Sequence, residues 1–155
     1  MNKNTTPRNV RNNNPLNIRR TNTKWQGMSA EQHDKSFCQF NEMKYGWRAA
    51  FILLCKTYYE KRRLRTVREI ISTWAPDFEN NTSVYIKRVS AWADVEQDSE
   101  LPSPRDNEAI WMRIAYCMAC VEGGFKPKTA ECPLELQPLV EGWMLYEEYR
   151  DAKRK

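Results

Sequence analysis

At 155 residues the chain suits one domain with a hydrophobic core, and its 41% apolar and 12% aromatic content excludes a disordered protein. The mean hydropathy of −0.82 indicates a strongly polar surface, and no apolar run approaches the roughly 20 residues of a membrane-spanning helix. The net charge of +5 favours anionic partners. No helix-turn-helix or other nucleic-acid-binding signature accompanies that charge, so nucleic acid is not the expected partner.

Neither end of the chain nor its cysteines point to export or to a metal. Residues 1–6 lack the apolar segment of a secretory signal peptide, so we expect synthesis in the cytoplasm and delivery to any cell-wall target by another route. The five cysteines are scattered, and His33 is the one histidine that could join them around zinc. We therefore expect reduced thiols, no metal and no organic cofactor.

The first third of the chain is expected to hold little helix. Residues 1–11 are predicted to form a disordered basic arm, and residues 12–150 one domain. Between Leu16 and Phe40 the apolar residues alternate in short, broken stretches, which predicts a small, irregular β-hairpin region.

Helical patterns then follow one another. Apolar spacing predicts a helix over about 45–60, and Thr66 with Glu69 forms a capping box for a second helix that closes at Pro76. Asn81 or Thr82 is a candidate cap for a third helix, with a predicted buried face of Val84, Tyr85, Val89 and Trp92.

Two further helices complete a mainly α chain. Ser103 and Pro104 suit the start of a helix that Gly123-Gly124 would stop. A last helix over about 134–151 is predicted to bury Leu136, Leu139, Val140, Trp143 and Tyr146.

Among the carboxylates of the sequence, Glu122 is the strongest candidate for a catalytic residue. It stands at the end of an apolar helix, immediately before the glycine break, and shares a helical face with Trp111, Ala115 and Met118. Burial there would raise the carboxyl pKa, which is what a general acid needs near neutral pH. The alternative is a glutamate at a helix end that turns toward solvent.

The segment around Glu122 resembles a known catalytic motif. Residues 114–127 read Ile-Ala-Tyr-Cys-Met-Ala-Cys-Val-Glu-Gly-Gly-Phe-Lys-Pro. This resembles the catalytic segment of lytic transglycosylases and goose-type lysozymes, where a helix ends in Glu-Ser-Gly-Phe-Asn-Pro and its Glu is the acid. Here Gly123 replaces the Ser and Lys126 the Asn.

The upstream half resembles a family of phage and prophage virion-associated proteins. Its motifs stand here as Asn-Asn-Pro-Leu-Asn-Ile-Arg at 13–19, Trp25-Gln-Gly, and Trp74-Ala-Pro followed by Glu79-Asn-Asn-Thr and Tyr85. Leu16 occupies the usual Gly position. The first motif is also similar to the hairpin that follows the catalytic helix in bacterial glucosaminidases. In those enzymes the catalytic helix precedes the hairpin. Here a helix over 104–122 that ends in Glu122 would take the place of that catalytic helix but follow the hairpin in sequence, as in a circular permutation.

These resemblances imply a mainly α, lysozyme-like single domain with a small β-hairpin region near the N-terminus, in a circularly permuted order. They imply a peptidoglycan-cleaving glycosidase of phage or prophage origin, of the lytic transglycosylase or muramidase type, that acts at the cell wall or in a phage particle. Glu122 would be the general acid. The residues expected to bind the glycan strand are Asn14, Asn17, Arg19, Trp25, Glu79, Asn81 and Tyr85.

Structural alternatives stay open for most of these residues. The three asparagines are also typical of turns and caps, and Trp25 and Trp74 suit either the core or a sugar-stacking surface. Glu79 is the rival acid, or a helix cap; it and Asp34 are weak candidates for the second carboxylate that a muramidase needs. The competing function is a non-catalytic virion component that serves assembly with other virion proteins or cell-wall binding.

Overall fold

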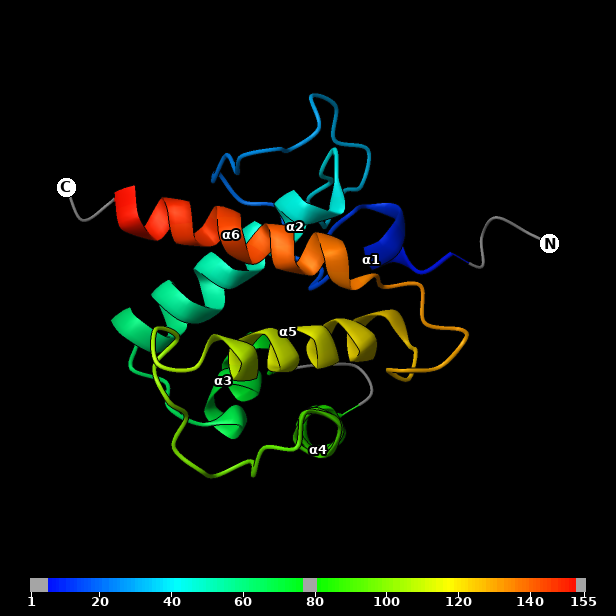
Figure 1. Ribbon diagram of the computed structural model, residues 1–155. Helices are drawn as coiled ribbons and strands as arrows, with labels where there is room; N and C mark the ends of the chain where they lie inside the picture. The colour runs from blue at the N-terminus through cyan, green and yellow to red at the C-terminus, as the bar shows by residue number, and fades with distance from the viewer. Residues whose placement is uncertain (1–5, 77–80, 153–155) are drawn as a thin grey trace.

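The computed structural model describes residues 6–76 and 81–152 and is mainly helical (Figure 1). Figure 1 shows α5 between two groups of helices, with α2 and α6 on one side and α3 and α4 on the other. No helix within the described ranges is long and apolar enough to cross a membrane. The helices, in chain order, are α1 (Arg8–Arg11), α2 (Met43–Phe51), the π-helix η2 (Ile52–Lys61), α3 (Val67–Trp74), α4 (Thr82–Ala93), α5 (Glu108–Gly123) and α6 (Leu136–Ala152).

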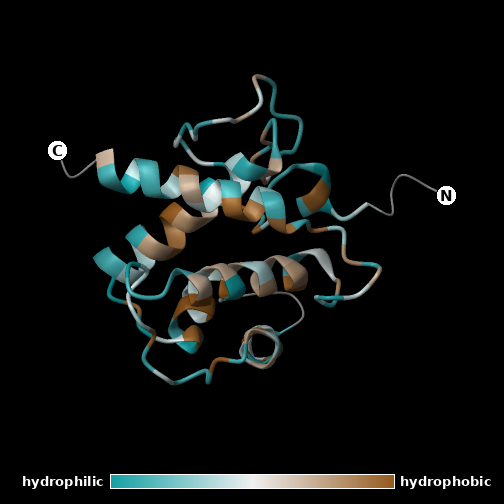
Figure 2. Cartoon of the chain, viewed as in Figure 1, coloured by the Kyte–Doolittle hydropathy of each residue, from teal (hydrophilic) through white to brown (hydrophobic). Residues whose placement is uncertain are grey.

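An aromatic cluster joins α2 to α6. The ring of Phe51 meets Trp143 edge-on at 4.9 Å between centroids, and Trp143 lies 5.0 Å from Tyr146. Gly142 faces the side chain of Trp47, where a Cβ would also collide with the backbone of α2, so this glycine lets the two helices approach closely. Figure 2 shows hydrophobic residues gathered on the helices, while the long loop before α2 is mostly hydrophilic.

The segment that precedes α2, residues 12–41, is here called the loop region. It contains no extended strand, but two isolated antiparallel bridges pair Arg19 with Phe37 and Met28 with Phe40. The two arms of the predicted hairpin are therefore antiparallel, although backbone pairing does not extend into a ladder.

Side-chain amides replace the missing backbone ladder. Asn14 has no exposed surface, and its Nδ2 donates to the carbonyl oxygens of Ile18 at 3.0 Å and Cys38 at 2.9 Å. Its Oδ1 accepts a hydrogen bond from the Ile18 backbone N–H at 2.8 Å. One buried amide thus holds both arms of the loop region together.

Residues 6–11 belong to the predicted basic arm, and part of this segment is helical and contacts α5. Arg8–Arg11 form the short helix α1, and the side chain of Asn9 is fully buried. Its Nδ2 donates to the carbonyl oxygens of Pro15 at 3.0 Å and Ala119 at 3.1 Å. These bonds fix the start of the chain against α5, 110 residues away in sequence.

The predicted helix caps are confirmed in the middle of the chain. The Thr66 side chain accepts a hydrogen bond from the Glu69 N–H at the start of α3, while Glu69 accepts one from the Arg65 N–H at 2.7 Å. Asn81 caps α4 by accepting from the Ser83 N–H. On α4, Tyr85 and Val89 are buried as predicted, together with Ile86, while Val84 and Trp92 are only half-buried.

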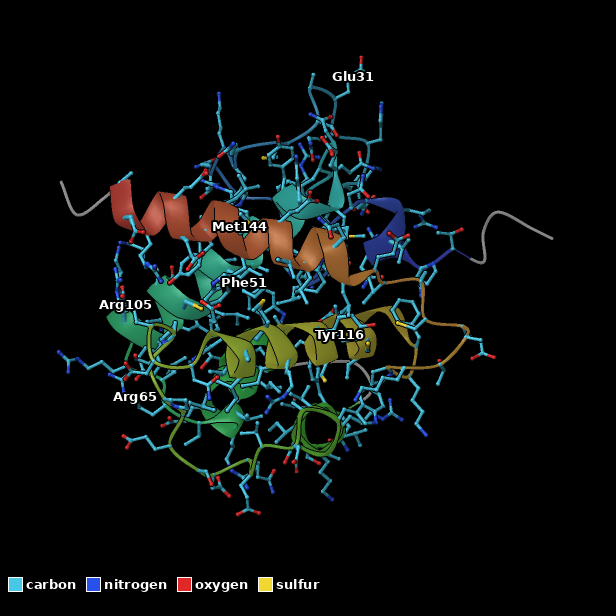
Figure 3. All side chains as sticks on the ribbon, viewed as in Figure 1. Glu31, Phe51, Arg65, Arg105, Tyr116 and Met144 are labelled. Atoms are coloured by element: carbon cyan, nitrogen blue, oxygen red, sulfur yellow. The ribbon has the colours of Figure 1, made fainter. Side chains whose placement is uncertain are left out.

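The last two helices differ from the expectation in detail. Helix α5 begins at Glu108 rather than near Ser103, because Asn107 provides its cap and Ser103 stabilises a turn before it. Its end is as predicted, with Gly124 in the left-handed conformation at φ 80°. On α6, Leu136 and Val140 were predicted to be buried; they are 63% and 44% exposed, on the same outer stripe as Met144 (Figure 3).

The structure contains all five cysteines as free residues. Four are buried, and Cys132 is half-buried beside the Tyr116 hydroxyl at 3.3 Å. No three His, Cys, Asp or Glu side chains within residues 6–76 and 81–152 gather closely enough to hold a metal ion.

Candidate active site

Glu122 lies in the last turn of α5, held from two other parts of the chain. Asn17 Nδ2, from the loop region, donates to Glu122 Oε1 at 3.0 Å. The Tyr85 hydroxyl, from α4, donates to Glu122 Oε2 at 3.0 Å. The same helical face carries Met118, which is fully buried, as the spacing predicted. The carboxylate is therefore turned toward the protein rather than toward open solvent, with both oxygens positioned.

Burial raises the pKa of Glu122 above its ordinary value. Opposing contributions come from the hydrogen bonds of Asn17 and Tyr85, from the Trp74 side chain and from the positive charge of Arg19, and they are smaller than the effect of burial. The carboxyl at the end of α5 also lies near the negative end of the helix dipole, which disfavours ionisation. Glu122 thus keeps its proton to a higher pH than a solvent-exposed glutamate does.

Tyr85 can serve Glu122 in both protonation states. Its hydroxyl lies 3.0 Å from Glu122 Oε2 and 3.4 Å from the Met118 carbonyl oxygen, and the side chain is 1% exposed. Burial, with the nearby charge of Glu122, raises the pKa of Tyr85 well above its usual value, so the hydroxyl stays protonated. It can donate to the ionised carboxylate, or donate to Met118 and accept from the protonated acid.

A cleft of about 1020 Å³ opens beside Glu122. The loop region forms one wall, η2 another, and the segment that follows α3 a third. Glu122 is the one acidic residue among the described residues that line the cleft. Its aromatic lining residues are Trp25, Phe37, Tyr58 and Trp74.

The aromatic side chains leave part of their surface in the cleft. Trp25 and Trp74 are half-buried, so each combines packing against the protein with an accessible surface. Trp74 is braced edge-on by Tyr58, with ring centroids 5.9 Å apart. A braced indole at the edge of a cleft is suited to stack on the apolar face of a sugar ring.

The structure brings together five of the eight residues that the sequence proposed for the site. Glu122, Asn17 and Tyr85 are joined by hydrogen bonds, and Arg19 and Trp25 line the same cleft. Their roles in catalysis or sugar binding stay predictions.

The other three residues stand differently. Asn14 is fully buried inside the loop region and has a structural role there. Asn81 has a φ of 99° and caps α4. Glu79 lies outside the described residues. Asp34, the other suggested second carboxylate, does not line the cleft, because Arg8 binds it through Nε and Nη2 at 2.6 Å each.

Sequence reasoning missed three residues that line the cleft. Arg8 was assigned to the basic arm over 1–11, and its contacts with Asp34 and with the Phe37 ring place it at the site. Tyr58 lies on the apolar stripe of the helix predicted over 45–60 and was given no role in the site. Phe37 was noted as an apolar residue of the predicted hairpin and was not proposed to bind the glycan; the alternation that points it away from buried Cys38 was the available signal.

Comparison with protein-family models gives no match. One curated relative is Protein P5 of Pseudoalteromonas phage PM2, which is 32% identical over 125 residues. The match covers 79% of this chain and 74% of the relative. It spans most of both proteins, at an identity too high for chance similarity of composition. The chain therefore belongs to the same family as Protein P5 of phage PM2.

Proposed function

We propose that this protein is a peptidoglycan-cleaving glycosidase of phage or prophage origin, with Glu122 as its general acid. The observation that carries the proposal is a half-buried carboxyl with a raised pKa, held by hydrogen bonds from Asn17 and Tyr85 at the side of a cleft lined with aromatic rings. Proton donation to a leaving oxygen needs such a group, and sugar rings stack on such a lining.

In the proposed reaction, Glu122 protonates the glycosidic oxygen between two sugars of the glycan strand. The C1–O bond then breaks, and positive charge develops at C1 and the ring oxygen. A hydrolase would need a second carboxylate, at about 5 Å as nucleophile or at about 6.5–9.5 Å to activate water. Among the described residues that line the cleft there is no second carboxylate.

This arrangement favours a lytic transglycosylase route. The C6 hydroxyl of the same sugar attacks C1, its proton passes to the Glu122 carboxylate, and a 1,6-anhydro sugar is released. Atoms balance without water, and the acid is regenerated. A muramidase is the alternative, with Glu79 as the candidate second carboxylate.

The second candidate function is a non-catalytic virion component that assembles with other virion proteins or binds the cell wall. Membership in the family of a phage protein is consistent with it. The same aromatic cleft would then hold a glycan strand without cutting it.

One experiment separates these functions. Purified wild-type protein, Glu122→Gln, Glu79→Gln and the exposed control Glu135→Gln are incubated with peptidoglycan sacculi, and soluble fragments are quantified and weighed by mass spectrometry. We expect release by wild type and by Glu135→Gln, and a loss on the order of 10²–10⁴-fold in Glu122→Gln.

The products decide the mechanism. Fragments lighter by one water than the hydrolysis products, with activity kept in Glu79→Gln, support the transglycosylase route. Hydrated fragments that disappear in Glu79→Gln support a muramidase. If the protein binds the sacculi but neither the wild type nor any variant releases soluble fragments, the enzymatic proposal is overturned and the binding function remains.

A further inference from the structure

On the side of the cleft where α1 meets the loop region, two arginines lie over one aromatic ring. The guanidinium carbon of Arg8 lies 4.5 Å from the centroid of the Phe37 ring, and that of Arg19 lies 5.1 Å from it. All three residues line the same cleft as Glu122. Stacking on the ring restricts each guanidinium and leaves its N–H groups to point along the wall.

The two arginines differ in how their charges are used. Arg8 makes a bidentate ion pair with Asp34, whose side chain is 8% exposed, so its charge is already balanced. Arg19 is exposed and forms no ion pair with an acid in residues 6–76 or 81–152. The cleft therefore holds one oriented cation whose charge no described carboxylate neutralises directly.

We propose that Arg19, held against Phe37, binds a carboxylate on the 3-O-lactyl branch of the glycan strand. This inference rests on the proposed function to the extent that the cleft takes a glycan. The carboxylate has two sources: the lactyl group itself in a strand without peptides, or the peptide stem where the lactyl group is amidated. A planar guanidinium matches either carboxylate with two parallel hydrogen bonds. A neutral N-acetylglucosamine strand offers no such group.

The composition of the cleft favours a single carboxylate over a polyphosphate. A nucleic-acid backbone needs a row of cations, because each phosphate in its path carries a charge. Apart from the two arginines, the polar residues on this side of the cleft are the neutral Asn17, Thr21, Thr23 and Ser36.

Binding can be measured without cleavage. In a Glu122→Gln protein, isothermal titration compares three soluble ligands of equal length: a neutral N-acetylglucosamine oligomer, a stem-free peptidoglycan glycan and a stem-bearing one. Arg19→Gln is then added, with Arg20→Gln as the matched control. Arg20 is the next residue, loses the same charge, and donates to the Asp34 carbonyl oxygen without lining the cleft. Circular dichroism and melting temperature verify that each variant folds.

We expect at least one carboxylate-bearing glycan to bind about tenfold more tightly than the neutral oligomer, in line with one charge-assisted bidentate contact. Arg19→Gln should abolish that preference, and Arg20→Gln should keep it. The ligand that retains the dependence on Arg19 identifies the source of the carboxylate.

Three results would overturn the inference: equal affinity for neutral and charged glycans, equal losses in Arg19→Gln and Arg20→Gln, or absence of glycan binding. A larger effect of Arg19→Gln on a DNA duplex than on any glycan would also overturn it and point to nucleic acid. Cleavage of sacculi without a dependence on Arg19 would leave the enzyme intact and remove this subsite. If the protein prefers the carboxylate-bearing glycan through Arg19 but does not cleave sacculi, the subsite stands and the enzymatic proposal fails.

Discussion

The loop region and the helical part of this protein are stabilised in opposite ways. Helices α2 to α6 satisfy their own backbone and pack through fully buried apolar side chains such as Leu54, Ile70 and Ile114. The loop region has almost no backbone ladder, and buried amides and one carboxylate take its place. Deleting one polar side chain should therefore cost far more in the loop region than in a helix.

The largest effect is expected from Asn14→Ala. The change leaves the Ile18 and Cys38 carbonyl oxygens and the Ile18 N–H without their partner in a buried place. The free energy of unfolding should fall by about 3 kcal/mol. Asn107→Ala, which removes an exposed helix cap, should cost only about 1 kcal/mol. Urea unfolding of both variants measures the difference, and equal losses would contradict the contrast between the two regions.

The next effect concerns acid sensitivity and Asp34. Its carboxylate accepts hydrogen bonds from Arg8, Asn12 and the N–H groups of Ser36 and Phe37, and the Arg8 guanidinium holds its pKa far below the usual range. A depressed pKa stabilises the fold above the unfolded-state value of about 4, and this stabilisation is lost as the pH falls below it.

We expect Asp34→Asn to lower the free energy of unfolding by about 2 kcal/mol at pH 7. The difference from wild type should shrink as the pH falls below about 4, where wild-type Asp34 loses its advantage. Urea unfolding at pH 7 and pH 3 provides the two values. A difference that is constant with pH would show that the ion pair with Arg8 does not stabilise the loop region.

The smallest effect concerns the contact of α4 with Glu122, which the loop region also reaches through Asn17. Tyr85→Phe keeps the packing of α4 but removes the hydroxyl that donates to Glu122. Given the proposed activity, kcat/KM should fall by up to about tenfold, the equivalent of one net hydrogen bond. Because that hydrogen bond lowers the pKa of Glu122, its loss raises the pKa further. The alkaline limb of the pH–rate profile should therefore move to higher pH.

Tyr58→Phe is the control for this measurement, since Tyr58 lines the cleft and makes no hydrogen bond to Glu122 among the described contacts. It should leave the alkaline limb in place. A shift toward lower pH in Tyr85→Phe would mean that the hydroxyl acts on Glu122 in a way other than by stabilising the carboxylate.

The same contrast explains how much the sequence could predict. Helix positions follow local rules, so apolar spacing and the caps at Thr66 and Asn81 were sufficient for α3 and α4. The start of α5 was misplaced because Ser103-Pro104 and Asn107-Glu108 are both good starts, and only packing chooses between them. The outer face of α6 was misjudged because apolar residues occur on both of its sides.

The site was predictable only where a motif marked it. Glu122, Asn17 and Tyr85 lie in segments that resemble known motifs, and the structure joins them. Arg8 could not be found this way, because it reaches the cleft through a bond to Asp34, 26 residues further along. Such long-range contacts between side chains produce no repeating pattern of apolar or polar residues from which they could be predicted.

The bond between Asn17 and Glu122 spans 105 positions, and this has a consequence for the order of synthesis. A ribosome makes the loop region first and the acid only after α4. A stalled or proteolysed chain that ends before α5 would contain the residues of the aromatic and basic walls of the cleft but not Glu122. Under the proposed function, such a fragment, if it folded, would bind glycan strands without cutting them and so compete with the full-length protein.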